Sequence, residues 1–235
     1  MTREELIKKV ALKMDEISSS DDVIVPVGIG DNNPLYTQIN NLLNESVNDV
    51  LMKAPIFRIQ NQVVLLEENN ITLEDIFGGL RKIAVISVPE DFIRIASITD
   101  ANFQRPIVDL SIEGDEVDNK QHNRFLVAKS AKPVAVIGRK QFITTTINPI
   151  TNEQNVESSI GRVIRCYSYD ASVTTKPIVQ YIKRYDNDRD TSAETDLDSY
   201  MIDVVSWVCA GKVFAAQGDI NKGKICDDNA AALMM

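Results

Sequence analysis

Two short motifs in the chain contain residue types that can bind a ligand, and the first is rich in glycine. Gly28-Ile29-Gly30 follows a strand-like run and precedes a helix, as in the turn that brings a backbone close to the phosphates of a dinucleotide. The third glycine of that fingerprint is missing, because Asn33 takes its place, and no βαβ unit follows. We therefore interpret the segment as a loop that caps the next helix.

The second motif is the acidic run Asp186-Asn187-Asp188-Arg189-Asp190, which resembles the beginning of a calcium-binding EF-hand loop. Such a loop needs a glycine for its sharp turn and a bidentate glutamate at its end. Thr191 and Leu197 occupy those two positions here. The run is therefore predicted to be a solvated acidic turn before a helix, and we expect neither a metal nor a cofactor.

Histidine and cysteine, the usual catalytic and metal-binding residues, are sparse. The single histidine, His122, lies in a polar run typical of a solvated loop. Cys166, Cys209 and Cys226 are far apart and form no CxxC pair, so neither a zinc ribbon nor a disulfide framework is indicated. We predict a protein that is not an enzyme. A small α+β hydrolase or transferase of unknown substrate remains the alternative.

Composition and charge narrow the choice of partners. The chain has 235 residues, of which 44% are hydrophobic, so it can bury a core. Its 34 acidic residues against 25 basic ones give a net charge of −9, which disfavours binding to nucleic-acid phosphates or to an anionic membrane. The N-terminal residues are charged and have no apolar core, so we expect no signal peptide and no membrane partner.

Hydrophobic periodicity predicts helices at both ends of the chain and strands between them, which is an α+β order. The expected helices are residues 2–17, 33–51, 195–214 and 220–235, with a short one near 72–79. The expected strands are residues 62–66, 83–88, 92–98, 125–128, 134–137, 141–146, 162–169 and 177–185. A long polar loop is predicted at residues 147–159.

These elements predict the fold class and the domains. The N- and C-terminal helices should pack as a helical bundle, with a largely antiparallel β region in between. Residues 1–82 form the helical part, which residues 190–235 complete, and residues 83–189 form the β-rich part. We expect the two parts to make one integrated subunit.

An aromatic stripe marks the last long helix. Tyr200, Trp207 and Phe214 recur at a spacing of seven residues and therefore share one side of it. Such a stripe serves either as core packing or as an interface between proteins. These three residues are the candidate interface of the chain.

Three segments together resemble the head–tail connector (adaptor) proteins that lie beneath the portal of short-tailed bacteriophages, and most of all the ring proteins of crAss-like phages. The first is the helix at 33–51, which ends in Ala54-Pro55. The second is the proline, acid and apolar strand pattern of 88–95, followed by an aromatic and a proline within 103–107. The third is the C-terminal helix, which runs through Tyr200, Trp207 and Phe214 to Gly218.

The resemblance implies a structural virion protein. It implies a homo-oligomeric ring of about twelve copies, closed by heterologous contacts between unlike faces of neighbouring subunits. The ring would bridge the portal protein to the next tail protein, and DNA would pass through its channel without specific binding. We expect the protein in the virion at the head–tail interface, and in the host cytoplasm during assembly. Another tail or capsid accessory protein is a further alternative.

The acidic surplus suits such a channel. About twelve copies would bring a total charge of roughly −100, and acids facing the channel would repel DNA phosphates and let the DNA slide. The candidate channel-facing acids are Asp186, Asp188, Asp190, Glu113, Asp115 and Glu116. The terminal segments and the loop at 147–159 are expected to be docking devices.

Overall fold

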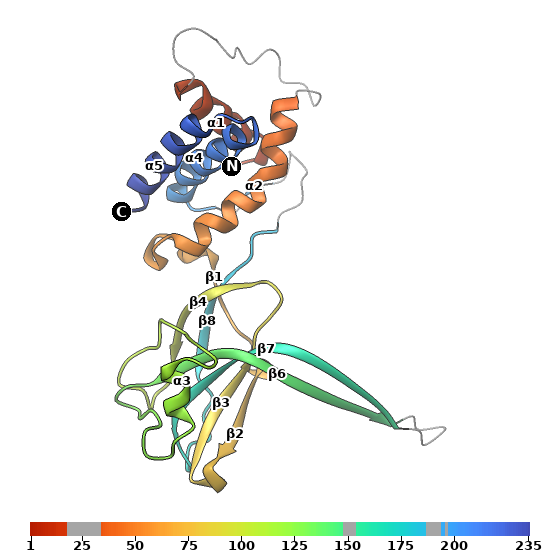
Figure 1. Cartoon of the computed structure of the whole chain (residues 1–235), viewed down its shortest axis with the longest axis vertical. Coiled ribbons are helices and arrows are strands. Elements are labelled where there is room, and N and C mark those ends of the chain that lie inside the picture. Colours follow the sequence, from red (N-terminus) through yellow and green to blue (C-terminus); the bar gives the residue numbers. More distant parts are fainter. Residues whose placement is uncertain (18–33, 148–153, 187–193, 196) are drawn as a thin grey trace. The chain divides into compact units, whose positions relative to one another are not determined.

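The computed structural model describes residues 1–17, 34–147, 154–186, 194–195 and 197–235, and it divides into two compact units. The first unit comprises Met1–Val63 and Ile182–Met235, and the second comprises Val64–Tyr181. Terminal helices and antiparallel-rich sheets make this an α+β fold, as predicted (Figure 1). The predicted caps at Asp31–Asn33 and most of the acidic run lie outside the described residues.

The first unit is a helical bundle built around α4 (Ser199–Ala216). This helix packs against α1 (Arg3–Ile17), α2 (Pro34–Lys53) and α5 (Ile220–Met234). Two short 3₁₀ turns, η1 (Ile56–Arg58) and η2 (Gln60–Gln62), follow α2. By length and composition α4 is the one described helix that could cross a membrane, and half of it is buried in the bundle, as a core helix should be.

Local signals position α1. Thr2 and Glu5 form the predicted capping box, in which each backbone N–H donates to the other's side chain at 2.9 and 3.2 Å. Apolar residues at helical spacing, Leu6, Ile7, Val10 and Met14, are buried. α1 and α5 are thus integral helices of the bundle, whereas the terminal segments were expected to be docking devices.

The helices α4 and α5 approach each other closely through glycine. A Cβ atom on Gly223 would lie 3.2 Å from the carbonyl oxygen of Gly211, and one on Gly211 would lie 3.1 Å from a carboxylate oxygen of Asp227. The carbonyl belongs to helical backbone and cannot move aside as a flexible side chain can. Side chains larger than hydrogen would therefore push the two helices apart.

We expect Gly223→Val to lower the stability of the helical unit by about 2 kcal/mol, because overpacking forces the backbone to shift. Trp207, the single tryptophan of the chain, lies in α4 of this unit, so urea unfolding followed by its fluorescence reports the unit selectively. Lys224→Val, at an exposed position of the same helix, is the control and should change stability by less than about 0.5 kcal/mol. Equal effects of the two substitutions would contradict close packing at Gly223.

Two sheets make up most of the second unit, although the strand-end residues Val63, Ile182 and Lys183 are assigned to the first. One has the order β1-β8-β4, with β1 (Val63–Leu65), β8 (Ile178–Lys183) and β4 (Phe92–Thr99). The other has the order β2-β3-β7-β6-β5. Its strands are β2 (Ile71–Ile76), β3 (Arg81–Ser87), β7 (Gln154–Asp170), β6 (Val134–Ile147) and β5 (Ser111–Ile112). A short helix, α3 (Glu116–Gln121), and the 3₁₀ turns η3 (Glu68–Asn70) and η4 (Phe77–Gly79) complete the unit.

Each face of the five-stranded sheet is covered by a hydrophobic cluster. On one face, Ile86, Ile164 and Tyr169 pack with Phe92 and Tyr181 of the other sheet. On the opposite face, the members include Val85, Val136, Val163, Tyr167, Val127 and Ala128. Residues 83–86 of β3 and 163–164 of β7 alternate between the two clusters, as the pleat of a strand requires. A bulge in the register of β3 and β7 places Tyr167 and Tyr169 in different clusters.

Several sequence predictions for this unit differ from the structure. The helical part was expected to extend to residue 82, but the first unit ends at Val63, because residues 71–82 are occupied by β2, η4 and the start of β3. The short helix predicted near 72–79 was wrong, since residues 72–76 pair with β3 in register and only 77–79 make a 3₁₀ turn. The strand predicted at 125–128 was also wrong: Asn123 accepts backbone hydrogen bonds from Leu126 and Val127 and makes the segment a turn.

Candidate functional site

The most distinctive feature of the second unit is an arm made by β6 and β7, which have 14 and 17 residues. Their antiparallel pairing continues from Arg139 opposite Arg162 to Ile147 opposite Gln154. We call these two stretches, 139–147 and 154–162, the arm. Figure 1 shows the arm extending well past the other strands of its sheet. The loop predicted at 147–159 is thus wrong for 154–159, which belong to β7.

Pairing with other strands stops at the base of the arm for identifiable reasons. The ladder between β3 and β7 ends with Ser87 opposite Val163, after which Val88 donates one more backbone hydrogen bond, to the carbonyl of Arg162 at 3.1 Å. Pro89 follows, and a proline has no N–H to continue the ladder. On the other side β5 pairs with β6 at two residues only. Among the described strands, the arm therefore has two outer edges without a ladder partner.

An aromatic side chain and an ion pair fix the base of the arm. The ring of Phe142 covers Gly161, where a Cβ atom would lie 2.9 Å from the ring, and it packs on the cluster that contains Val136 and Val163. Lys140 forms an ion pair with Glu74 of β2. These contacts hold the first residues of the arm to the sheet.

A carboxylate on the loop after β5 ties both strands together at the same place. Glu113 accepts hydrogen bonds from the Arg165 guanidinium at 2.7 Å and from the Arg139 backbone N–H at 3.0 Å. These two bonds lower the pKa of Glu113, so it is ionised at neutral pH. Arg165 also donates to the Arg139 carbonyl at 2.9 Å. Glu113, predicted to face a channel, thus has a structural role within its own subunit.

The other candidate channel-facing acids lie in different parts of the chain. Asp115 caps α3 by accepting from the Asp118 N–H at 2.7 Å, and Glu116 pairs with Lys120 at 2.6 Å, which lowers the pKa of Glu116. Asp186 is exposed in the first unit. Asp188 and Asp190 lie outside the described residues. Their orientation toward a channel stays a prediction.

The aromatic stripe of α4 is engaged within the helical unit. The guanidinium of Arg58 lies 4.7 Å from the Tyr200 ring centroid, and Lys13 lies 4.8 Å from that of Trp207. Phe214 is buried, with Lys222 over its ring at 5.6 Å. Each ring thus has a cation from another segment of the same chain, an arrangement that favours intramolecular packing.

We expect Trp207→Ala to lower the stability of the isolated subunit by about 2 kcal/mol, less than the loss for a fully buried tryptophan, because the Trp207 ring is partly exposed. Helical circular dichroism during urea unfolding measures the loss. An unchanged subunit stability together with weakened assembly would instead make Trp207 an interface residue.

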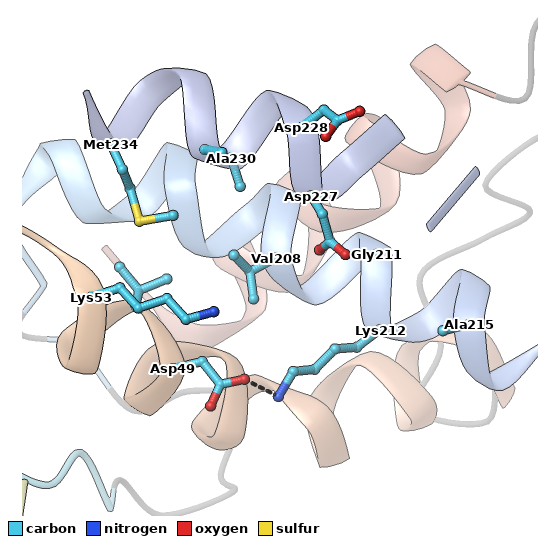
Figure 2. A pocket seen from close by; sticks show the side chains of 12 residues that line it. Asp49, Lys53, Val208, Gly211, Lys212, Ala215, Asp227, Asp228, Ala230 and Met234 are labelled. Carbon is cyan, nitrogen blue, oxygen red and sulfur yellow. Dashed lines mark ion pairs between the residues drawn. The ribbon is translucent and has the colours of Figure 1, made fainter. Parts of the chain in front are cut away.

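A cleft of about 550 Å³ opens in the helical unit between α2, α4 and α5. Figure 2 shows the ion pair between Asp49 and Lys212 on its α2 side, with Met234 and Asp227 on α5. Lys212 contacts both Glu45 and Asp49 at 2.6 Å; burial lowers the pKa of Lys212, but these hydrogen bonds outweigh it and raise the pKa overall. No serine, cysteine or histidine lines the cleft, so it has no pair of nucleophile and base from these types.

The thiols are in settings that disfavour reactivity, and the histidine lies on the surface. All three cysteines are buried and free, and burial raises the pKa of Cys209 and of Cys226 to about 11. Thiols of this kind are poor nucleophiles at neutral pH. His122 is exposed, and its Nε2 lies 3.7 Å from the buried carboxylate of Asp118 one turn earlier. Within the described part of the chain, no three residues of the metal-ligating types form a metal site.

Comparison with known proteins does not identify a family. No model of a protein family matches the chain, and no curated protein matches it either. Its function must therefore be inferred from the arm and from the contacts within each unit.

Proposed function

We propose that the chain is a structural subunit that assembles with copies of itself through the arm, as a head–tail connector ring of a short-tailed bacteriophage. The single observation that carries the proposal is the arm itself. A two-stranded ribbon alone in water is marginally stable. A ribbon that extends beyond its sheet is therefore stabilised most by pairing with a second protein surface.

The geometry of the arm favours a neighbouring copy as that surface. Both outer edges present backbone N–H and C=O groups that no described strand satisfies, and such edges pair readily with a strand of another chain. An arm on one side of a subunit that docks on a different face of the next is a heterologous contact. Repetition of such a contact around an axis closes a ring.

The neighbours of the ring are proposed from a resemblance. Residues 33–51, residues 88–95 and the C-terminal helix resemble the corresponding parts of head–tail connector proteins. In such a ring the portal protein lies on one side and the next tail protein on the other. DNA passes through the channel without specific contacts. The net charge of −9 on each chain favours this, because acidic residues repel DNA phosphates. The virion would hold the protein at the head–tail interface after assembly in the host cytoplasm.

Native mass measurement of the purified chain at rising concentration tests this function. We expect a closed species of about twelve times the 26.2 kDa chain mass. A chain that stays monomeric at every concentration would contradict the proposal. A small closed oligomer of another size would point to a different tail or capsid accessory protein.

A further inference from the structure

Two arginines face each other where the arm leaves the sheet. Arg139 and Arg162 are directly opposite in the register of β6 and β7, so their side chains lie on the same face of the ribbon. Both are exposed. Like charges opposite each other in a sheet are destabilising. The pair therefore favours an anion that can lie against both guanidinium groups.

The basic residues next to them are already neutralised. Lys140 pairs with Glu74, and Arg165 pairs with Glu113 at 2.7 Å. Neither Arg139 nor Arg162 has an ion-pair partner among the side chains that the structure describes. The two arginines are thus the cations left available at the base of the arm.

The surroundings of the arginines also restrict what can bind. The Arg162 guanidinium lies 5.8 Å from the ring centroid of Phe92, which itself stacks on Tyr181 at 5.8 Å. This contact orients one guanidinium at the edge of the core. Two residues further out on the same face, the side chain of Ile160 is 73% exposed. The surface thus combines two cations with an exposed apolar side chain.

We infer that Arg139 and Arg162 bind carboxylates of an acidic segment on a second copy of this chain. This inference rests on the proposed function and names the chemistry of its contact. Arginine suits the role because its planar fork matches a carboxylate. The chain's net charge of −9 makes a second copy a rich source of carboxylates, whereas duplex DNA would be repelled by that charge and demands a larger basic surface.

The double charge reversal Arg139→Glu with Arg162→Glu tests the inference. We expect its assembly to weaken at least tenfold, and wild-type assembly to weaken with added salt. The matched control is Lys129→Glu with Lys132→Glu, which makes the same change in charge at two exposed lysines that also face each other in a β-bridge. Near-ultraviolet circular dichroism of the buried tyrosines verifies that the second unit stays folded.

Labelled poly-L-glutamate and a labelled 20-base-pair DNA duplex provide a readout that does not depend on assembly. We expect the wild type to bind poly-L-glutamate, the arginine variant to lose that binding, and the lysine variant to keep it.

The remaining outcomes separate this inference from the proposed function. If the arginine variant assembles as well as the wild type, this inference is overturned and the proposed function is not. Duplex binding that only the arginine variant loses would assign the pair to nucleic acid instead. A monomeric wild type that still binds poly-L-glutamate would overturn the proposed function and the second copy as the partner, and would support only the binding of carboxylates by the arginine pair.

Discussion

Replacing Arg3 by alanine is expected to destabilise the helical unit by about 3 kcal/mol or more. Arg3 is fully buried and joins α1 to α2. Its Nε donates to the Asn40 side chain at 2.5 Å, its Nη1 to the Asn44 side chain at 2.7 Å, and its Nη2 to the Asn40 carbonyl at 2.9 Å. Alanine would leave these acceptors unsatisfied and a cavity beside them.

Urea unfolding followed by Trp207 fluorescence measures the effect of Arg3→Ala, because the only tryptophan lies in the same unit. Lys8→Ala is the control in the same helix. Lys8 pairs with Glu4 at 2.8 Å on the surface, and its loss should change stability by less than about 0.5 kcal/mol. Similar small effects of both substitutions would show that the buried arginine does not hold α1 to α2.

Shortening the arm is expected to abolish assembly while the subunit stays folded. In this variant residues 143–158 are removed and an Asn-Gly pair joins Phe142 to Ser159, which are directly opposite in the register. Asn-Gly is the preferred two-residue hairpin turn. The variant keeps Phe142 on Gly161 and the ion pair of Lys140 with Glu74, so the sheet loses none of the described contacts at the base.

A second deletion removes the residues that connect the two strands of the arm in the sequence. Removing residues 148–153 and joining Ile147 to Gln154 through the same Asn-Gly pair retains every described residue pair of the arm. This variant should assemble like the wild type, as seen by native mass. Assembly of the armless variant, or equal failure of both variants, would contradict a role for the paired strands.

The helices were predictable because their sequence pattern and their burial agree. The apolar spacing of residues 2–17 and 33–51 matches α1 and α2 to within two residues, and the capping box at Thr2 is formed. The predicted start at Thr195 was early, since α4 begins at Ser199 and the Thr195 hydroxyl donates to the Met1 carbonyl instead. A distant backbone partner of that kind leaves no signal in local sequence.

The β region was less predictable, since tertiary pairing decided its elements. Thr72-Leu73-Glu74-Asp75 has a pattern that suits a helix start, but pairing with β3 makes it a strand. Gly78 and Gly79, read as the end of a helix, have φ values of +68° and +84° and make the turn to β3.

The arm itself was missed for a related reason. The polar stretch at 154–159 lacks the alternation of apolar and polar residues that predicts a strand, and it therefore indicated a loop. One available signal was the set Arg139, Lys140, Arg162 and Arg165, a concentration of basic residues in an acidic chain. It could have marked the base of the arm before the register was known.

Amide hydrogen exchange in the arm, compared between the free and the assembled protein, tests the central claim most directly. In the free subunit, the N–H groups on the two outer edges of 141–147 and 154–160 should exchange rapidly, because no described strand protects them, whereas the Arg139 N–H is held by Glu113. We predict that they become protected as the oligomer forms, while protection in α2 stays constant. Rapid exchange throughout the arm in the fully assembled protein would contradict the account.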